Sequence, residues 1–496
     1  MKKVIILGSG FAGLSSAAFM AKAGWEVTVL EKHPVPGGRA RQLKESGFTF
    51  DMGPSWYWMP GVFERFFASF GKTIEEYYTL RRLDPSYRVY WPQTIMDIPA
   101  DYNELKKLFE KTEPGSGVKL DKFLKEAAYK YKVGIHKLVQ KPGASVAEFA
   151  DWDLVKGLFK LDVFKSMEHH VNRHFKTGEL RQLLKFPVLF LGALPKDTPA
   201  LYSLMNYADI KLGTWYPMGG MHQVVEAMMS VAMELGVKFL FNENVIEFNI
   251  QSDIITSVIT QNTQDTKKDF KEHKADVIIS GADYHFTEML LPAKNRSYSE
   301  QYWQSRVMAP STLIYYIGLN KKIPGLQHHS LFFDVNFETH GEEIYSNPQW
   351  PSDPLFYVSA TSVTDAGVAP PGCENLFFLI PVAAGLTGDT TSLRDEYFDK
   401  ILKRFEARMK TNIKDAIIFR RSYSVSNFNT DYNSFKGNAY GLSNTLMQTA
   451  LFKPGIRSKK LKNLFFTGQL TVPGPGVPPS LVSGEVVSRE VVKNYG

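Results

Sequence analysis

The sequence predicts an α/β protein whose two ends fold into one domain around a parallel sheet. Residues 3–8, 12–23 and 26–31 are typical of a strand, a helix and a second strand, with glycine at each turn. Residues 275–283 and 462–468 are further apolar runs that end in small residues. The strand-then-glycine pattern at both ends of the chain favours a single shared sheet.

The other elements follow in chain order from hydrophobic periodicity. We expect residues 62–140 and 151–186 to be mainly helical and residues 235–260 to form short strands. The polar stretch 261–274 is typical of a hairpin turn. Residues 311–319 and 374–384 are strand candidates, and residues 478–493 form a closing helix.

Composition excludes several classes of protein. The 496 residues are 44% apolar and 22% charged, as in a globular chain. The single cysteine, Cys373, excludes a disulfide framework and multi-cysteine metal sites. A net charge of +7 is too small an excess to indicate nucleic acid as a partner. No uncharged apolar run of about 18 residues is present, so we expect no transmembrane helix.

The first turn carries a nucleotide-binding pattern. Gly8, Gly10 and Gly13 have the GxGxxG spacing, after a strand and before a helix. These glycines allow a tight turn, close approach of a pyrophosphate and close helix–sheet packing. Glu31 ends the second strand, where a carboxylate can accept hydrogen bonds from both ribose hydroxyls of an adenosine. We therefore predict a dinucleotide site.

Further motifs carry a resemblance to a known family. Gly37-Gly38-Arg39 and the block GFTFDMGP (47–54) complete a string that resembles the N-terminal signature of FAD-dependent amine oxidases and carotenoid desaturases. The segment 463–488 resembles the closing motif of bacterial phytoene-desaturase-type enzymes. The resemblance implies FAD as the cofactor, held between the two chain ends.

The resemblance also implies the domain organisation. We expect a Rossmann-like FAD-binding domain (1–85, 215–295 and 455–496), a helical lid or membrane-docking region (86–214) and a mixed-sheet substrate domain (296–454, shared with parts of 140–214). The motifs and the resemblance together assign these residues to the cofactor: Gly8, Gly10, Phe11, Ala12, Gly13, Glu31, Lys32, Gly38, Arg39, Gly53, Pro54, Ser55, Val245, Gly468, Gly476, Val477 and Pro478.

The activity that the resemblance implies is carotenoid desaturation. Two hydrogens leave adjacent carbons of a long polyene, one as hydride to flavin N5 and one as a proton. Phytoene converted towards lycopene is the leading substrate, with oxygen or a quinone as electron acceptor. A 1-hydroxycarotenoid 3,4-desaturase, a carotenoid isomerase and a non-catalytic prenyl-lipid carrier like the GDP-dissociation inhibitors remain alternatives.

An apolar substrate must be recognised by buried area and tunnel shape. The tunnel candidates are Trp56, Tyr57, Trp58, Phe190, Tyr202, Tyr207, Trp215, Tyr216 and Phe378. No proton acceptor is evident, and Asp209 and Glu168 are only weak candidates. We expect no metal site, because His169, His170 and His174 have neither an HExxH glutamate nor a cysteine pair beside them.

Basic and Phe-rich helices favour contact with a membrane surface. Residues 105–140 hold nine Lys against four Asp and Glu. A helix with Lys on one face and Phe or Leu on the other can lie on an anionic bilayer. We therefore expect a cytoplasmic protein that is peripherally associated with the inner face of the cell membrane.

Overall fold

A five-stranded parallel sheet contains strands from both ends of the chain. The computed structural model describes all residues except 144, 146–147, 149–160 and 265–268, and of Phe190, Leu191 and Ala450 it describes no side chain. The strand order is β19 (Leu464–Phe466), β13 (Val277–Ser280), β1 (Lys3–Leu7), β2 (Glu26–Glu31) and β9 (Lys238–Phe241). All neighbours run parallel, with Val4 beside both Val277 and Val27. This confirms that the two ends share one sheet.

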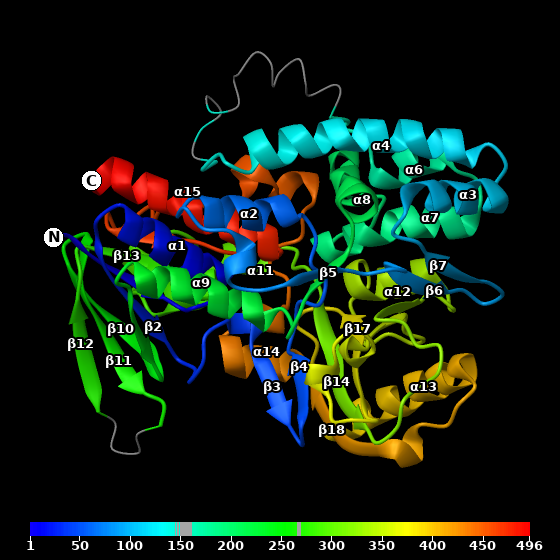
Figure 1. Cartoon of the computed structure of the whole chain (residues 1–496). Coiled ribbons are helices and arrows are strands. Elements are labelled where there is room, and N and C mark those ends of the chain that lie inside the picture. Colours follow the sequence, from blue (N-terminus) through cyan, green and yellow to red (C-terminus); the bar gives the residue numbers. More distant parts are fainter. Residues whose placement is uncertain (144, 146–147, 149–160, 265–268) are drawn as a thin grey trace.

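Helices α1 (Phe11–Lys22) and α15 (Val477–Tyr495) lie against each other (Figure 1). Small residues allow this close contact. A Cβ on Gly484 would lie 2.6 Å from the backbone oxygen of Ala12. Ser15 Oγ donates to the Leu481 carbonyl at 2.7 Å. Helix α9 (His222–Glu234) also packs on α1, and α2 (Pro60–Ala68) packs on α15. These contacts fix the last helix over the first turn of the chain.

A seven-stranded mixed sheet is the second large sheet of the structure. Its order is β18 (Ile417–Tyr423), β14 (Ser311–Leu319), β17 (Glu374–Val382), β16 (Phe356–Ser359), β15 (His329–Phe332), β6 (Tyr87–Tyr90) and β7 (Ile95–Ile98). Only the β15–β6 pair is parallel. Helix α13 (Thr391–Met409) covers one face, with Phe405 against Phe378.

Residues 62–140 are mainly helical as expected, but strands β6 and β7 are an exception within them. They extend the second sheet, because Tyr87, Val89 and Tyr90 are buried there and pair with β15. The helical expectation holds for α3 (Tyr102–Thr112) and α4 (Ser116–Val133), and further on for α6 (Met167–His174) and α7 (Gly178–Lys185). Residues 149–160, within the second helical prediction, lie outside the described part of the chain.

Helices α3, α4, α6, α7 and α8 (Leu204–Tyr207) form a layer at the upper right of Figure 1. Strands β10 (Glu243–Gln251), β11 (Ile254–Asn262) and β12 (Phe270–Lys274) form a three-stranded sheet. Two further sheets have two strands each: β3 (Gln42–Glu45) with β4 (Phe48–Asp51), and β5 (Leu80–Arg82) with β8 (Trp215–Pro217). The remaining helices are α10 (Tyr284–Met289), α11 (Glu300–Gln304), α12 (Phe337–Tyr345) and α14 (Val425–Tyr432). Among the described residues, every helix is too short or too polar to span a bilayer.

Candidate functional site

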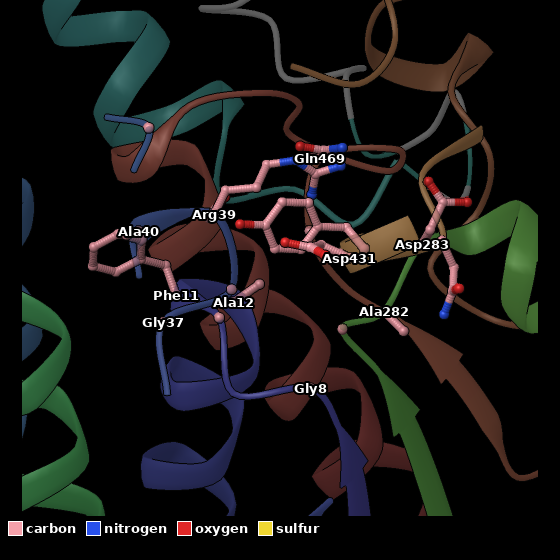
Figure 2. Close-up of a pocket in the computed structure, with 18 of the residues that line it drawn as sticks. Gly8, Phe11, Ala12, Gly37, Arg39, Ala40, Ala282, Asp283, Asp431 and Gln469 are labelled. Carbon is pink, nitrogen blue, oxygen red and sulfur yellow. The ribbon is translucent and has the colours of Figure 1, made fainter. Parts of the chain in front are cut away.

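A cavity of about 290 Å³ lies at the carboxyl ends of β1 and β2. Segments from both ends of the chain line it: Gly8 and Gly10 from the first turn, and Gly468, Gly476 and Val477 from the last. Figure 2 shows Gly8, Phe11 and Ala12 on one side of the space and Asp431 and Gln469 on another. Ligand sites in open α/β sheets lie at this edge, so this cavity is the candidate site.

The glycines of the first turn have different tasks. Gly8 has a φ of +88°, which other residues adopt only with strain. A Cβ on Gly13 would lie 2.0 Å from the Gly8 carbonyl oxygen, so Gly13 is required by packing. A Cβ on Gly10 would have a single neighbour, the Gly38 Cα at 4.0 Å. The space beside Gly10 is therefore open, as close approach of a ligand requires.

Glu31 is held rigidly at the end of β2. Its Oε2 accepts hydrogen bonds from Ser9 N and Ser9 Oγ, both at 2.8 Å. Its Oε1 accepts from His33 N at 2.9 Å. Because the carboxylate lines the cavity and Oε1 has a second acceptor position, Glu31 can still accept a hydrogen bond from a ribose hydroxyl.

Arg39 is a half-buried cation that lacks a carboxylate ion pair among the described residues. Its Nη2 donates to Ser434 Oγ at 2.9 Å and to the Asn438 carbonyl at 3.3 Å. Its Nε is buried and has no acceptor among the described atoms. Burial lowers the pKa of Arg39, and the charge of nearby Asp283 opposes this effect only in part. An anion in the cavity would supply the missing partner, so a diphosphate fits here.

The last turn of the chain forms the opposite wall. Gly468 N donates to Ser483 Oγ at 2.9 Å, which ties the end of β19 to α15. Helix α15 begins at Val477, directly after Gly476 with a φ of +112°. Pro478 and Pro479 carry no N–H, so the first turn of α15 offers the cavity the Val477 N–H and the positive end of the helix dipole, which stabilises negative charge there.

Fourteen of the seventeen predicted cofactor residues line the cavity. The other three are Gly13, Ser55 and Pro478. Gly13 packs beneath the turn, Ser55 Oγ accepts from Tyr357 OH at 3.1 Å, and Pro478 is the second residue of α15. Whether these residues bind the cofactor stays a prediction.

Sequence reasoning missed several parts of the lining. Asn244, Gly281 to Asp283, Thr312, Ile314, Leu379, Asp431 to Asn433, Tyr440, Gln469 and Ser480 also line the cavity. Gln469 and Ser480 lie in the closing motif, whereas the others come from segments without a recognisable nucleotide motif and are brought together only by the fold. For these others, the one available signal was Gly281, which ends the buried strand β13 with the same small-residue pattern as Gly8.

The tunnel candidates surround the cavity rather than line it. None of the eight with described side chains belongs to its lining, and the side chain of Phe190 is outside the described part of the structure. Trp56 stacks on His329 at 4.2 Å and lies 5.3 Å from Tyr87 between ring centres. It follows Gly53 and Pro54, which line the cavity.

The other candidates are held by hydrogen bonds and packing. Tyr57 OH pairs with Tyr78 OH at 3.0 Å, and Trp58 Nε1 donates to Thr214 Oγ1 at 2.9 Å. Tyr202 OH pairs with Thr449 Oγ1, and Tyr207 packs on Tyr131. Trp215 Nε1 donates to the Leu212 carbonyl, and Tyr216 OH donates to Asp365. The placing of Phe378 in a tunnel needs correction. Neighbouring residues of β17 face opposite sides, so Leu379 reaches the cavity while Phe378 packs against α13.

Neither weak candidate for the proton acceptor lines the cavity. Asp209 is buried and accepts from Tyr87 OH at 2.7 Å; burial raises its pKa to about 7. Glu168 is half-exposed at the start of α6 and pairs with Lys185 Nζ at 3.1 Å. Their contacts make both residues part of the surrounding scaffold.

Comparisons with known proteins agree with this geometry. The family model described as flavin containing amine oxidoreductase matches residues 11–492. The carotenoid 3,4-desaturase of Haloarcula japonica is 37% identical, over 99% of this chain and 98% of that protein. The zeta-carotene-forming phytoene desaturase of Myxococcus xanthus is 28% identical, over 99% of this chain and 94% of that protein.

A solved structure of cyclohexylamine oxidase from Brevibacterium oxydans has the same fold. Its TM-score is 0.57, with 14% identity over 99% of both chains. The expected α/β class and the expected resemblance are both confirmed. The chain belongs to the flavin-containing amine oxidoreductase family, which implies a flavin cofactor.

Proposed function

We propose that this chain is an FAD-dependent carotenoid desaturase that introduces double bonds into a long apolar polyene. Phytoene, converted towards lycopene, is the proposed substrate. The similarity of full-length carotenoid desaturases to 99% of this chain carries the proposal. The cavity supports it, since its wall combines a charged and an apolar part.

The charged part suits the adenosine diphosphate portion of FAD. Glu31 would accept a hydrogen bond from a ribose hydroxyl, and the N–H groups of the first turn of α1 would face the phosphates. The guanidinium of Arg39 would complete its hydrogen bonds on the diphosphate. When bound, FAD supplies the acceptor for a hydride.

The apolar part suits the ring and the reacting end of the substrate. Ile314 and Leu379 of the second sheet, together with Tyr440, reach the cavity from the side opposite α1. The cluster around Trp56 adds buried aromatic faces that can pack on a polyene and stabilise positive charge on it. We assign no side-chain base. Water is left to accept the proton.

A second candidate is a 1-hydroxycarotenoid 3,4-desaturase. The observation that favours it is the similarity of this chain to the carotenoid 3,4-desaturase of Haloarcula japonica. The two candidates differ only in substrate. Purified protein loaded with FAD should therefore be incubated with phytoene and, separately, with a 1-hydroxycarotenoid, and the products separated by chromatography.

The expected result is conversion of phytoene to more unsaturated, coloured carotenes. Conversion of the hydroxycarotenoid alone would select the second candidate. A geometrical isomer without loss of hydrogen would indicate an isomerase. Unchanged substrate that stays bound would indicate a prenyl-lipid carrier and overturn the proposal. Oxygen and a soluble quinone, supplied in turn, would identify which of the two proposed electron acceptors supports turnover.

The proposal includes docking on the inner face of the cell membrane. Val118, Lys122, Lys125 and Tyr129 are exposed at a spacing that places them on one face of α4. Such a face combines apolar and basic contacts with an anionic surface. Flotation with anionic vesicles tests this docking.

Wild-type protein should float with anionic vesicles and stay at the bottom with neutral ones. The double variant Lys122→Glu, Lys125→Glu should lose flotation. The matched control, Lys403→Glu with Lys414→Glu, changes exposed lysines on and after α13 and should keep it. Equal flotation of both double variants would contradict docking through α4.

A further inference from the structure

Two histidines and a glutamate converge between helices α4 and α6. His170 and His174 lie one turn apart on α6, and Glu126 comes from α4. Glu126 Oε2 lies 3.7 Å from His170 Nε2 and 3.9 Å from His174 Nε2. None of the three lines the flavin cavity. The two helices run side by side at the upper right of Figure 1.

His170 has no hydrogen-bond partner in the described part of the chain. It is only 1% exposed, and both of its ring nitrogens lack a partner there. A buried polar group without a partner destabilises the fold by its full cost of desolvation. Coordination of a metal by His170 Nε2 would avoid part of this cost. This nitrogen already faces Glu126 Oε2 at 3.7 Å.

An imidazolium–carboxylate ion pair does not account for the cluster. Burial lowers the pKa of His170 to about 3, and the nearby charge of Lys130 lowers it further. Burial also lowers the pKa of His174. The separations of 3.7 and 3.9 Å between the carboxylate oxygen and the two ring nitrogens are too long for hydrogen bonds. Neutral imidazole is the form that binds metals.

The separations are close to those of a metal site. In a tetrahedral zinc site with bonds of about 2.1 Å, neighbouring ligand atoms lie about 3.4 Å apart. The three ligand atoms here all lie within 4.8 Å of one another, and the two measured histidine–glutamate separations exceed the tetrahedral value by about 0.5 Å or less. Small side-chain rotations would close this difference.

The surroundings provide an opening for a fourth ligand. The Glu126 side chain is 30% exposed, so water can reach the cluster from that side. Arg173 Nη2 lies 3.6 Å from the same carboxylate oxygen and would have to turn towards solvent, where its side chain is already 46% exposed. Lys130 is engaged by Asp162 at 3.1 Å. Cations nearby reduce the affinity for a dication without blocking the ligands.

We propose that Glu126, His170 and His174 bind one zinc ion, with water as the fourth ligand. Imidazole nitrogen with carboxylate oxygen is a ligand set that selects zinc-like transition metals over calcium or magnesium. The ion would join α4 to α6 in the helical layer. This revises the expectation of no metal, which considered only ligands close in sequence. It does not depend on the proposed catalytic function.

The flavin-loaded, tag-free protein is first dialysed against a chelator. Titration of this protein with zinc then tests the site. Calorimetry should give one zinc ion per chain, and zinc should raise the temperature of thermal unfolding. Co²⁺ should give the visible absorption of a tetrahedral site. His170→Gln and Glu126→Gln should each weaken zinc binding at least about tenfold. His169→Gln changes an exposed neighbour on the same helix and should bind like wild type.

Wild-type protein that binds no zinc would overturn the proposal. Zinc binding that is equally strong in His170→Gln and Glu126→Gln would overturn it too. Circular dichroism of each variant shows whether it is folded. Because Glu126 is partly exposed, its Gln variant keeps the experiment decisive if the change at buried His170 prevents folding.

Discussion

Replacing Gly10 and Gly13 by alanine, one at a time, separates ligand contact from packing in the first turn. A Cβ on Gly13 would lie 2.0 Å from the Gly8 carbonyl oxygen, against the 3.0 Å below which real Cβ contacts are essentially absent. The turn would have to shift by about 1 Å, and overpacking of this kind costs about 1–3 kcal/mol or more. Gly13→Ala should therefore lower the free energy of unfolding of the apoprotein by at least that amount.

Gly10→Ala should change the stability of the fold by less than about 1 kcal/mol, because the lower entropy of the unfolded chain is opposed by the poorer fit of alanine at the N-cap of α1. Gly10 has a φ of −73° and a ψ of 175°, which alanine adopts without strain. The new methyl group would meet no protein atom closer than 4.0 Å. Alanine also reduces the entropy of the unfolded chain, which stabilises the fold by about 0.4–1 kcal/mol. The methyl group would instead occupy the space that a diphosphate needs, and FAD affinity should fall at least tenfold, or by about 1.4 kcal/mol.

Urea unfolding of the apoproteins followed by circular dichroism measures the first quantity. Titration with FAD, followed by quenching of flavin fluorescence, measures the second. The reasoning would be refuted if apo Gly10→Ala were less stable than wild type by 1 kcal/mol or more. It would also be refuted if Gly10→Ala bound FAD as tightly as wild type, because the open space beside Gly10 would then not hold the diphosphate.

Three further substitutions test other parts of the account. Glu31→Gln replaces an acceptor of Ser9 or His33 by an amide donor and should lower the free energy of unfolding by about 1–3 kcal/mol as well as weaken flavin binding. The half-exposed Glu26→Gln, at the start of the same strand, is the control, and equal effects of the two changes would contradict the assignment. Burial lowers the pKa of Lys453 from 10.5 to about 7. Between these two pH values the unfolded state therefore binds more protons than the folded state. The free energy of unfolding rises with pH there, by up to about 1.4 kcal/mol per pH unit. In urea unfolding, Lys453→Met should remove this dependence of stability on pH, and the exposed Lys460→Met should keep it. An unchanged pH dependence in Lys453→Met would be inconsistent with a neutral buried amine. Gly484→Ala would place a methyl group 2.6 Å from α1 and should lower the thermal stability and the flavin content together. Wild-type values of both quantities would argue against close packing of α1 on α15.

The nucleotide side of the site could be predicted because its residues are contiguous. The turn from Gly8 to Gly13, the end of β2 and the Gly38-Arg39 pair each combine a motif with a local element. Spacing alone therefore indicated their place relative to a dinucleotide. The two chain ends could be joined for the same reason, since each pairs a buried strand with a glycine.

The rest of the site depends on long-range pairing that no local pattern encodes. Strand β17 is buried on both faces, so its sequence has no alternation to show that Leu379, and not Phe378, reaches the cavity. Strands β6 and β7 are four residues each and join the far sheet through a parallel partner. Glu126 meets His170 only because α4 packs on α6.

Anaerobic mixing of the flavin-loaded protein with phytoene in vesicles tests the central claim most directly. The claim is that both chain ends enclose one flavin that takes hydride from an apolar polyene. The account predicts that the oxidised flavin band disappears while absorption of a longer polyene grows in equal molar amount, and that admission of oxygen or a quinone restores the band. A flavin that stays oxidised beside unchanged phytoene and 1-hydroxycarotenoid would contradict it.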